Sequence, residues 1–96
     1  MGSIASARRA FNLTREFVME RKVFGKPLSY MQNTQFKMAE MDTEIEIVEV
    51  FIDHLVAEHN EDRLTANMAA KAKLQSTEIE WKMLDLGVQL HGGAGY

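Results

Sequence analysis

Apolar side chains recur at alternating steps of three and four residues along most of this chain. This spacing puts them on one face of an α-helix, and no segment alternates strictly between apolar and polar residues as a half-buried strand does. Only one proline interrupts the chain, and four of its six glycines lie in the last ten residues. The pattern predicts an all-α protein with three long helices, at about residues 4–22, 29–59 and 63–91.

Each predicted helix has its own apolar seam, the row of residues that faces the other helices. The seam of the first helix consists of Ile4, Ala7, Phe11, Thr14 and Val18. The seam of the second consists of Met31, Gln35, Met38, Met41, Ile45, Val48, Ile52 and Leu55. The seam of the third consists of Met68, Ala72, Gln75, Ile79, Met83, Leu86 and Leu90. We expect five of these side chains to be buried: Ile45, Val48, Ile52, Ile79 and Leu86.

Short connections between the helices predict that consecutive helices are antiparallel. The glycine and proline of residues 24–27 stop the first helix, and Ser29 caps the second. A turn at residues 60–62 follows, with Asn60 in the conformation that ends a helix, and the glycines after His91 end the third helix. The expected architecture is an up-down bundle of three antiparallel helices.

The third helix carries a second apolar stripe, made of Leu74, Trp81, Leu84 and Val88. We expect Trp81 to be at least half covered by a neighbour. Two other helices do not cover both apolar stripes of the third helix. One or two further helices, or a partner subunit, should therefore complete the bundle. A chain that leaves such a surface open is expected to self-associate.

The composition narrows the classes of function. Hydrophobic residues make up 46% of the 96 residues, which indicates one globular domain. The net charge of −3 lacks the basic surplus of a nucleic-acid binder. The absence of cysteine excludes disulfides and thiol nucleophiles, and no apolar run is long enough to span a membrane. We expect a soluble protein of the cytoplasm or, in a eukaryote, of the mitochondrial matrix.

No residue pattern indicates a metal site or a catalytic nucleophile. The chain has no Glu-x-x-His motif of the kind that holds paired irons in helical bundles. His54 and His59 are five residues apart and do not share a helix face. The serines and threonines lie in helical or capping positions without a histidine partner. We therefore expect no metal ligand and no catalytic residue in this chain.

Two segments allow both a structural and a functional interpretation. Residues 21–27 place Arg21 and Lys22 at the end of a helix, where cations complement the helix dipole, but the planar guanidinium of Arg21 also matches phosphate oxygens. Residues 89–96 combine Gln89 with three glycines. Such a cluster ends a helix, and it also lets the backbone approach a flat or anionic ligand closely.

Taken in this order and at this separation, the segments resemble the C-terminal helical domain of the acyl-CoA dehydrogenase family of flavoproteins. The resemblance runs from about Ala7 to Tyr96. It rests on four segments, residues 20–27 (ERKVFGKP), 32–41 (QNTQFKMAEM), 69–73 (AAKAK) and 88–96 (VQLHGGAGY).

The resemblance implies a C-terminal four-helix bundle, of which this chain has three helices, in a homo-oligomer that is a dimer or a tetramer. It implies FAD as the cofactor and an acyl-CoA thioester as the substrate. Arg21 would pair with the FAD pyrophosphate, Phe24 would pack near the cofactor, and Gln32 would lie near the adenosine. The remaining implied contacts, to the adenine-diphosphate part, come from Gln89, Gly92 and Gly93.

One departure from the family pattern concerns the carboxylate that removes the α-proton of the substrate. In the family it lies either downstream of the Gly-Gly motif or upstream of the first helix here, and this chain spans neither position. We expect a fragment or truncated relative that is inactive alone and contributes subunit-interface and FAD contacts to an acyl-CoA dehydrogenase. The alternative is a non-catalytic helical interaction module that has lost the cofactor.

Overall fold

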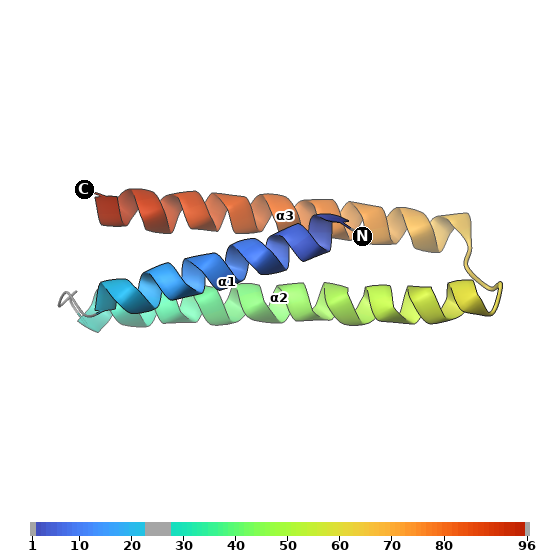
Figure 1. Cartoon of the computed structure of the whole chain (residues 1–96), viewed down its shortest axis with the longest axis horizontal. Coiled ribbons are helices and arrows are strands. Elements are labelled where there is room, and N and C mark those ends of the chain that lie inside the picture. The colour runs from blue at the N-terminus through green and yellow to red at the C-terminus, as the bar shows by residue number, and fades with distance from the viewer. Residues whose placement is uncertain (1, 23–27, 96) are drawn as a thin grey trace.

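Three α-helices account for most of the chain. The computed structural model describes the backbone of residues 2–22 and 28–95, and the side chains of residues 2–20 and 33–90. Helix α1 spans Gly2–Lys22, α2 spans Leu28–Asn60 and α3 spans Ala66–Gly95. Consecutive helices run in opposite directions along a rod with extents of 53 × 17 × 17 Å (Figure 1). The all-α class and the packing of three helices are as expected from the sequence.

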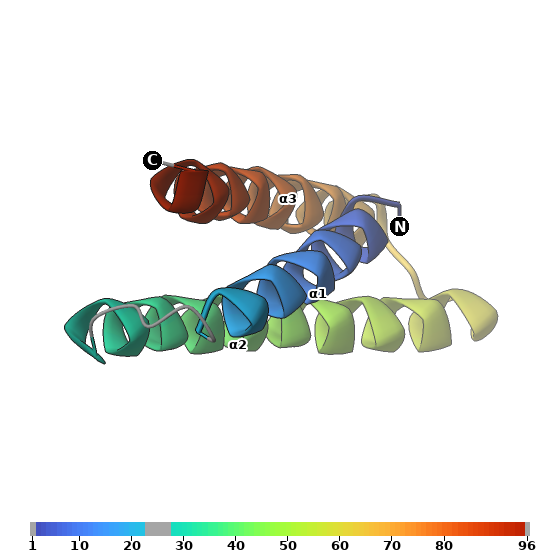
Figure 2. The same cartoon turned by 60° about the vertical axis from the view of Figure 1, so that its left-hand side comes forward.

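The shorter helix α1 lies obliquely across the pair formed by α2 and α3 (Figure 2). Its buried face consists of Ile4, Ala7, Phe11 and Thr14, with Val18 partly buried. All five residues belong to the predicted seam. The C-terminal end of α1, the start of α2 and the end of α3 lie at one end of the rod, and the α2–α3 turn lies at the other (Figures 1 and 2).

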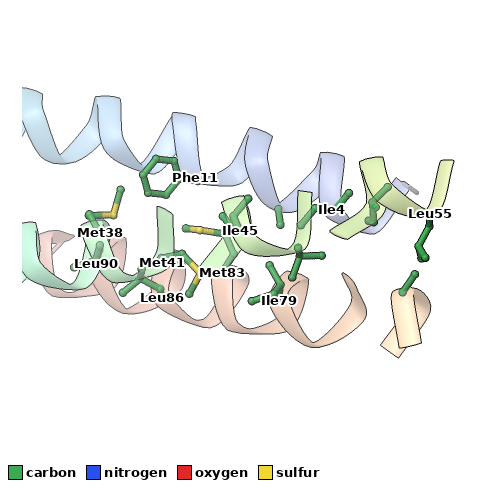
Figure 3. Packing of buried hydrophobic residues seen from close by; sticks show 14 residues of the cluster. Ile4, Phe11, Met38, Met41, Ile45, Leu55, Ile79, Met83, Leu86 and Leu90 are labelled. Carbon is green, nitrogen blue, oxygen red and sulfur yellow. The ribbon is translucent and has the colours of Figure 1, made fainter. Parts of the chain in front are cut away.

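The buried faces of α2 and α3 form the rest of the core (Figure 3). On α2 the buried side chains are Thr34, Met38, Met41, Ile45, Val48, Ile52 and Leu55. On α3 they are Ala72, Ser76, Ile79, Met83, Leu86 and Leu90, which we call the inner seam. The five side chains that the sequence predicted to be buried are all buried.

Two polar positions of the predicted seams are wrong. Thr34 is buried where Gln35 was expected, and Ser76 is buried where Gln75 was expected, while both glutamines are exposed. The buried positions keep a strict alternation of steps of four and three, which holds a seam on one face of a helix. Threonine and serine are also short enough to lie between closely packed helices, whereas the glutamine side chain is longer.

The prediction that Trp81 is at least half covered is also wrong for the single chain, because Trp81 is 69% exposed. It belongs to a row on the side of α3 that faces away from the inner seam. This row, which we call the outer stripe, consists of Ala70, Leu74, Thr77, Trp81, Leu84 and Val88. Helices α1 and α2 both pack on the inner seam, so the described part of the chain supplies no helix to cover the outer stripe.

The turn between α2 and α3 is longer than expected. The N–H groups of Asp62 and Arg63 donate to the carbonyls of His59 and Glu58, over 3.1 and 2.8 Å. This pair of bonds is the Schellman motif, and Asp62 takes its left-handed position with φ of 59°. The expected role of Asn60 is therefore wrong, because Asn60 is still helical.

Helix α3 begins three residues later than expected because Thr65 caps it. The Thr65 hydroxyl accepts a hydrogen bond of 3.1 Å from the N–H of Met68, as an N-cap side chain does.

The end of α3 differs from the prediction too, since the helix continues to Gly95 instead of ending at His91. Glycine permits a left-handed backbone but does not impose it, so the glycines after His91 can remain helical. A glycine within a helix costs about 1 kcal/mol relative to alanine.

Candidate functional site

The elements that carry the expected cofactor residues meet at one end of the bundle (Figure 1). Arg21 is in the last turn of α1, Gln32 is near the start of α2, and Gln89, Gly92 and Gly93 are near the end of α3. Phe24 lies outside the described residues, as do the side chains of Arg21 and Gln32. Gln89 is therefore the one expected cofactor residue whose side chain is described.

The Gln89 amide lies on an exposed face of α3, where its Nε2 donates a hydrogen bond of 2.9 Å to Asp85. This bond fixes the orientation of the amide, because Asp85 is one helical turn before it. It uses one of the two N–H donors and leaves the carbonyl oxygen available to a ligand. Gln89 can thus both donate to and accept from the same partner group.

Gln89 lines a groove of about 600 Å³ between α2 and α3. The groove is lined by Lys37, Glu40, Met41, Glu44, Lys82, Asp85, Leu86 and Gln89. Lys82 Nζ lies 3.0 Å from a Glu44 oxygen, and this hydrogen bond raises the pKa of the lysine. Three carboxylates therefore face two ammonium groups, one of which is already paired.

This charge balance bears on the FAD contact that the family resemblance implies for Gln89. A pyrophosphate carries two negative charges, and the carboxylates of Glu40 and Asp85 would repel it. The hydroxyl and amino groups of an adenosine are neutral, and they match an amide and carboxylates as hydrogen-bond partners. The described side chains are thus compatible with a neutral adenosine, whereas a diphosphate would need a cation from outside the groove, which is the role expected of Arg21.

A second ionic cluster joins α1 to α2 and was not singled out by the sequence. Arg8 Nη2 and Nε lie 2.9 and 3.2 Å from the Glu49 carboxylate, and Nη1 lies 2.7 Å from Asp42. The hydrogen bonds to Glu49 and then Asp42 raise the pKa of Arg8, so it stays charged. Arg8 also lies over the ring of Phe11, 5.3 Å from its centroid. The sequence did hold a signal for this cluster. Arg8 directly follows the seam residue Ala7 on α1, and the flank of α2 is acidic, so the two helices can form ion pairs when they pack.

A cavity of about 410 Å³ lies at the opposite end of the rod, near the α2–α3 turn. Its wall is mostly apolar, with Leu55, Leu64 and Ala72, and His59 and Lys73 also line it. The buried hydroxyl of Ser76 lines it as well, and this oxygen has no hydrogen-bond partner in the described part of the chain.

Within residues 2–20 and 33–90, no three histidine or acidic side chains lie close enough together to hold a metal ion. Among the described helices, none is both long and apolar enough to cross a membrane.

The protein-family model for the acyl-CoA dehydrogenase C-terminal domain matches residues 1–96, which is the whole sequence. The chain belongs to the acyl-CoA dehydrogenase family. Within the family it is 36% identical over 94 residues to the mitochondrial long-chain specific acyl-CoA dehydrogenase of Mus musculus. It is 32% identical to a probable acyl-CoA dehydrogenase of Bacillus subtilis and 34% identical to the mitochondrial isobutyryl-CoA dehydrogenase of Dictyostelium discoideum.

These alignments each cover 98% of the present chain. They cover only 22% of the mouse relative, 25% of the bacterial one and 23% of the Dictyostelium one, so the chain spans about a quarter of their length. No solved structure gives a significant match to the chain.

Proposed function

We propose that this chain is part of an FAD-dependent acyl-CoA dehydrogenase, to which it contributes cofactor contacts and part of a homo-oligomer interface. The observation that carries the proposal is the match of the family's C-terminal domain to residues 1–96. Dehydrogenation breaks two C–H bonds on adjacent carbons of the acyl thioester, one as a proton and one as a hydride. FAD, when bound, supplies the hydride acceptor.

This chain's own residues hold the cofactor in the proposal and do not take the proton. The Arg21 guanidinium pairs with the pyrophosphate, because a planar fork of N–H donors matches two phosphate oxygens. Phe24 packs near the cofactor and Gln32 lies near the adenosine. No residue of this chain is assigned the role of the base that accepts the α-proton.

The proposed role of Gln89 follows from its amide, which Asp85 holds in place on the edge of the α2–α3 groove. We assign it a hydrogen bond to the adenosine part. Gly92 and Gly93 have no side chains, so a ligand can approach their backbone closely.

The substrate class in the proposal is an acyl-CoA, with no chain length assigned. One relative is named for long-chain and another for isobutyryl substrates, at nearly equal identity. The whole protein is proposed to act as a homodimer or homotetramer in the cytoplasm or, in a eukaryote, in the mitochondrial matrix.

The test is flavin retention by the full open reading frame that encodes this chain. We expect the purified protein to carry FAD, measured by its visible absorbance. Arg21→Ala should weaken FAD binding by about 10- to 150-fold, because a hydrogen bond to a charged group contributes about 1.5–3 kcal/mol.

Arg9→Ala is the matched control, since it removes an exposed arginine from the same helix. It should leave FAD binding unchanged. Equal retention by the two variants would remove Arg21 from the site. A full-length protein that folds but binds no flavin would instead support the non-catalytic helical module.

A further inference from the structure

The ion pairs of Arg8 join α1 to α2 at a single level of the rod. The guanidinium meets the Glu49 carboxylate side-on, with Nη2 and Nε 2.9 and 3.2 Å from its two oxygens, and Nη1 lies 2.7 Å from Asp42. The two carboxylates are seven residues apart on α2, which is two helical turns or about 10.5 Å along the axis. Arg8 therefore lies between two anions that share one face of α2.

This arrangement fixes the position of α1 along α2. A displacement of α1 toward either carboxylate would lengthen the hydrogen bonds to the other one. The guanidinium also lies over the buried ring of Phe11 on its own helix, 5.3 Å from the centroid, and this contact limits how far it can turn to follow such a displacement. Only 26% of the Arg8 side chain is exposed, so water has limited access to replace these contacts.

The apolar seam of α1 specifies this position less strictly. Seam residues recur every three or four positions, so a displacement of α1 by one turn, about 5.4 Å, again brings apolar residues onto the core. Charged and polar groups at one level of a helical bundle distinguish such registers, because only one register pairs them. In α1 that level is the level of Arg8.

The second half of α1 depends on this anchor. Beyond Thr14, no described side chain of α1 is fully buried, and Phe17 and Val18 are half-buried. Arg21 follows Arg8 by thirteen residues of continuous helix, about 20 Å along the axis. A displacement of the helix at Arg8 is therefore carried to its last turn, where α1 meets the start of α2 and the end of α3 (Figure 1).

We propose that Arg8 is a positioning residue for the cofactor site. Through Glu49 and Asp42 it sets the register of α1 on α2, and thereby holds Arg21 at the end of the rod where the FAD contacts are proposed. This inference rests on the proposed function for the role of Arg21. It adds an ionic cluster near the other end of α1 that acts on the cofactor without touching it.

Cofactor affinity in the protein expressed from the full open reading frame is the first measurement. Arg8→Met removes the charge and keeps an unbranched stem. It should weaken FAD binding by about three- to tenfold, because affinity falls with the fraction of chains that hold Arg21 in place. Arg15→Met is the matched control and should leave the affinity unchanged. Arg15 lies over the same Phe11 ring, 5.9 Å from its centroid, but belongs to none of the ion pairs among the described residues.

A stability control separates the position of α1 from folding. Ile52→Val removes a buried methyl group from α2 and should lower the unfolding temperature without changing an ion pair. It should leave the FAD affinity unchanged well below that temperature. Reversal of all three charges, with Arg8→Glu, Asp42→Lys and Glu49→Arg together, should restore the affinity that Arg8→Glu alone loses. Equal weakening by Ile52→Val and Arg8→Met, or no recovery after the reversal, would overturn the proposal.

The register itself can be measured without cofactor in the 96-residue chain, which contains no cysteine. A nitroxide label on Leu13→Cys should broaden the NMR signals of the α3 amides near Leu84 and Val88, since Leu13 lines a groove with both residues. In Arg8→Met the broadening should spread or move by about one helical turn along α3. Unchanged broadening would overturn the register role of Arg8. Arg21→Ala should leave the label pattern unchanged, whereas its FAD retention tests the proposed function alone.

Discussion

Helix α3 carries two apolar rows with the same spacing on opposite faces, and the two rows differ in burial. All six residues of the inner seam are buried, whereas the large residues of the outer stripe are exposed. The difference comes from what packs on each face. Both α1 and α2 lie against the inner seam, and residues 2–22 and 28–95 form no fourth helix for the other side. Spacing therefore identifies an apolar face of a helix, but the number of neighbouring helices decides whether the same chain covers it.

The two rows also differ in composition. The centre of the inner seam consists of Ile79, Met83 and Leu86, which fill space between helices without polar atoms. The outer stripe places Thr77 one helical turn before Trp81. Tryptophan combines an apolar ring system with an N–H donor, and it is enriched in contacts between proteins. The inner seam thus has the composition of a core, whereas the outer stripe combines apolar side chains with polar groups that can stay exposed.

The largest expected effect separates the two rows directly. Met83→Ala removes a side chain with no exposed surface and should lower the free energy of unfolding by about 2–5 kcal/mol, because it leaves a cavity. Trp81→Ala removes a larger side chain and should change the stability of the monomer by less than about 0.5 kcal/mol. Urea denaturation at a concentration low enough for the monomer measures both. Equal losses would show that the outer stripe belongs to the core.

The next effect lies within the inner seam and has the opposite sign. Ser76→Ala should stabilise the chain by about 1–2 kcal/mol, because it removes a buried hydroxyl that lacks a described partner. Thr77→Ala, one residue away in the outer stripe, is the control and should gain at most about 0.7 kcal/mol, from helix propensity alone. Thermal unfolding followed by circular dichroism compares the two, and a loss of stability in Ser76→Ala would indicate that a water satisfies this oxygen.

A smaller gain is expected at the border between the two rows. Gly87 is helical, and a methyl group added there would meet Thr14 Oγ1 at 3.5 Å, an ordinary contact. Gly87→Ala should therefore stabilise the chain by up to about 1 kcal/mol through helix propensity alone. The denaturation midpoint measures the gain. A destabilised variant would mean that α1 lies closer to α3 than described.

The smallest effect lies at the α2–α3 turn, which neither row reaches. A hydrogen bond from Arg63 holds the pKa of Glu58 below its ordinary value of 4.5. A carboxyl whose pKa is lower in the folded state stabilises the fold above its unfolded pKa, and this contribution is lost as the pH falls through the folded pKa. In Arg63→Gln, the Glu58 pKa measured by NMR titration should return toward 4.5. A pKa that stays low would assign the shift to another group.

The sequence predicted the helices and their seams because burial imposes a period that the residues must follow. It failed at Gln35 and Gln75, where the buried neighbours are short hydroxyl residues that hydrophobicity does not distinguish. It failed at Trp81, because the period does not reveal how many helices surround a face. It also placed the turn too early. The left-handed residue after α2 is Asp62, and α3 begins only after its N-cap residue, Thr65.

For the candidate site, the sequence contributed residue types and their order, and the structure adds that α1 and α3 both end at the same end of the rod. The bond between Gln89 and Asp85 could have been anticipated from their four-residue separation. The acidic balance of the α2–α3 groove could not, because it depends on which flank of α2 faces which flank of α3. The roles of Arg21, Phe24 and Gln32 remain predictions from the family resemblance.

The methionines of this chain are distributed unevenly between interior and surface. Met38, Met41 and Met83 are buried in the core, whereas Met19 is 59% exposed on α1. Peroxide should oxidise Met19 quickly and reach the three core thioethers only when the helices separate. Each sulfoxide formed inside would then replace an apolar side chain with a polar one and hinder reclosure. The rate at which the three core methionines are oxidised would thus report how often the helices separate, and each oxidised core methionine would make the next separation easier.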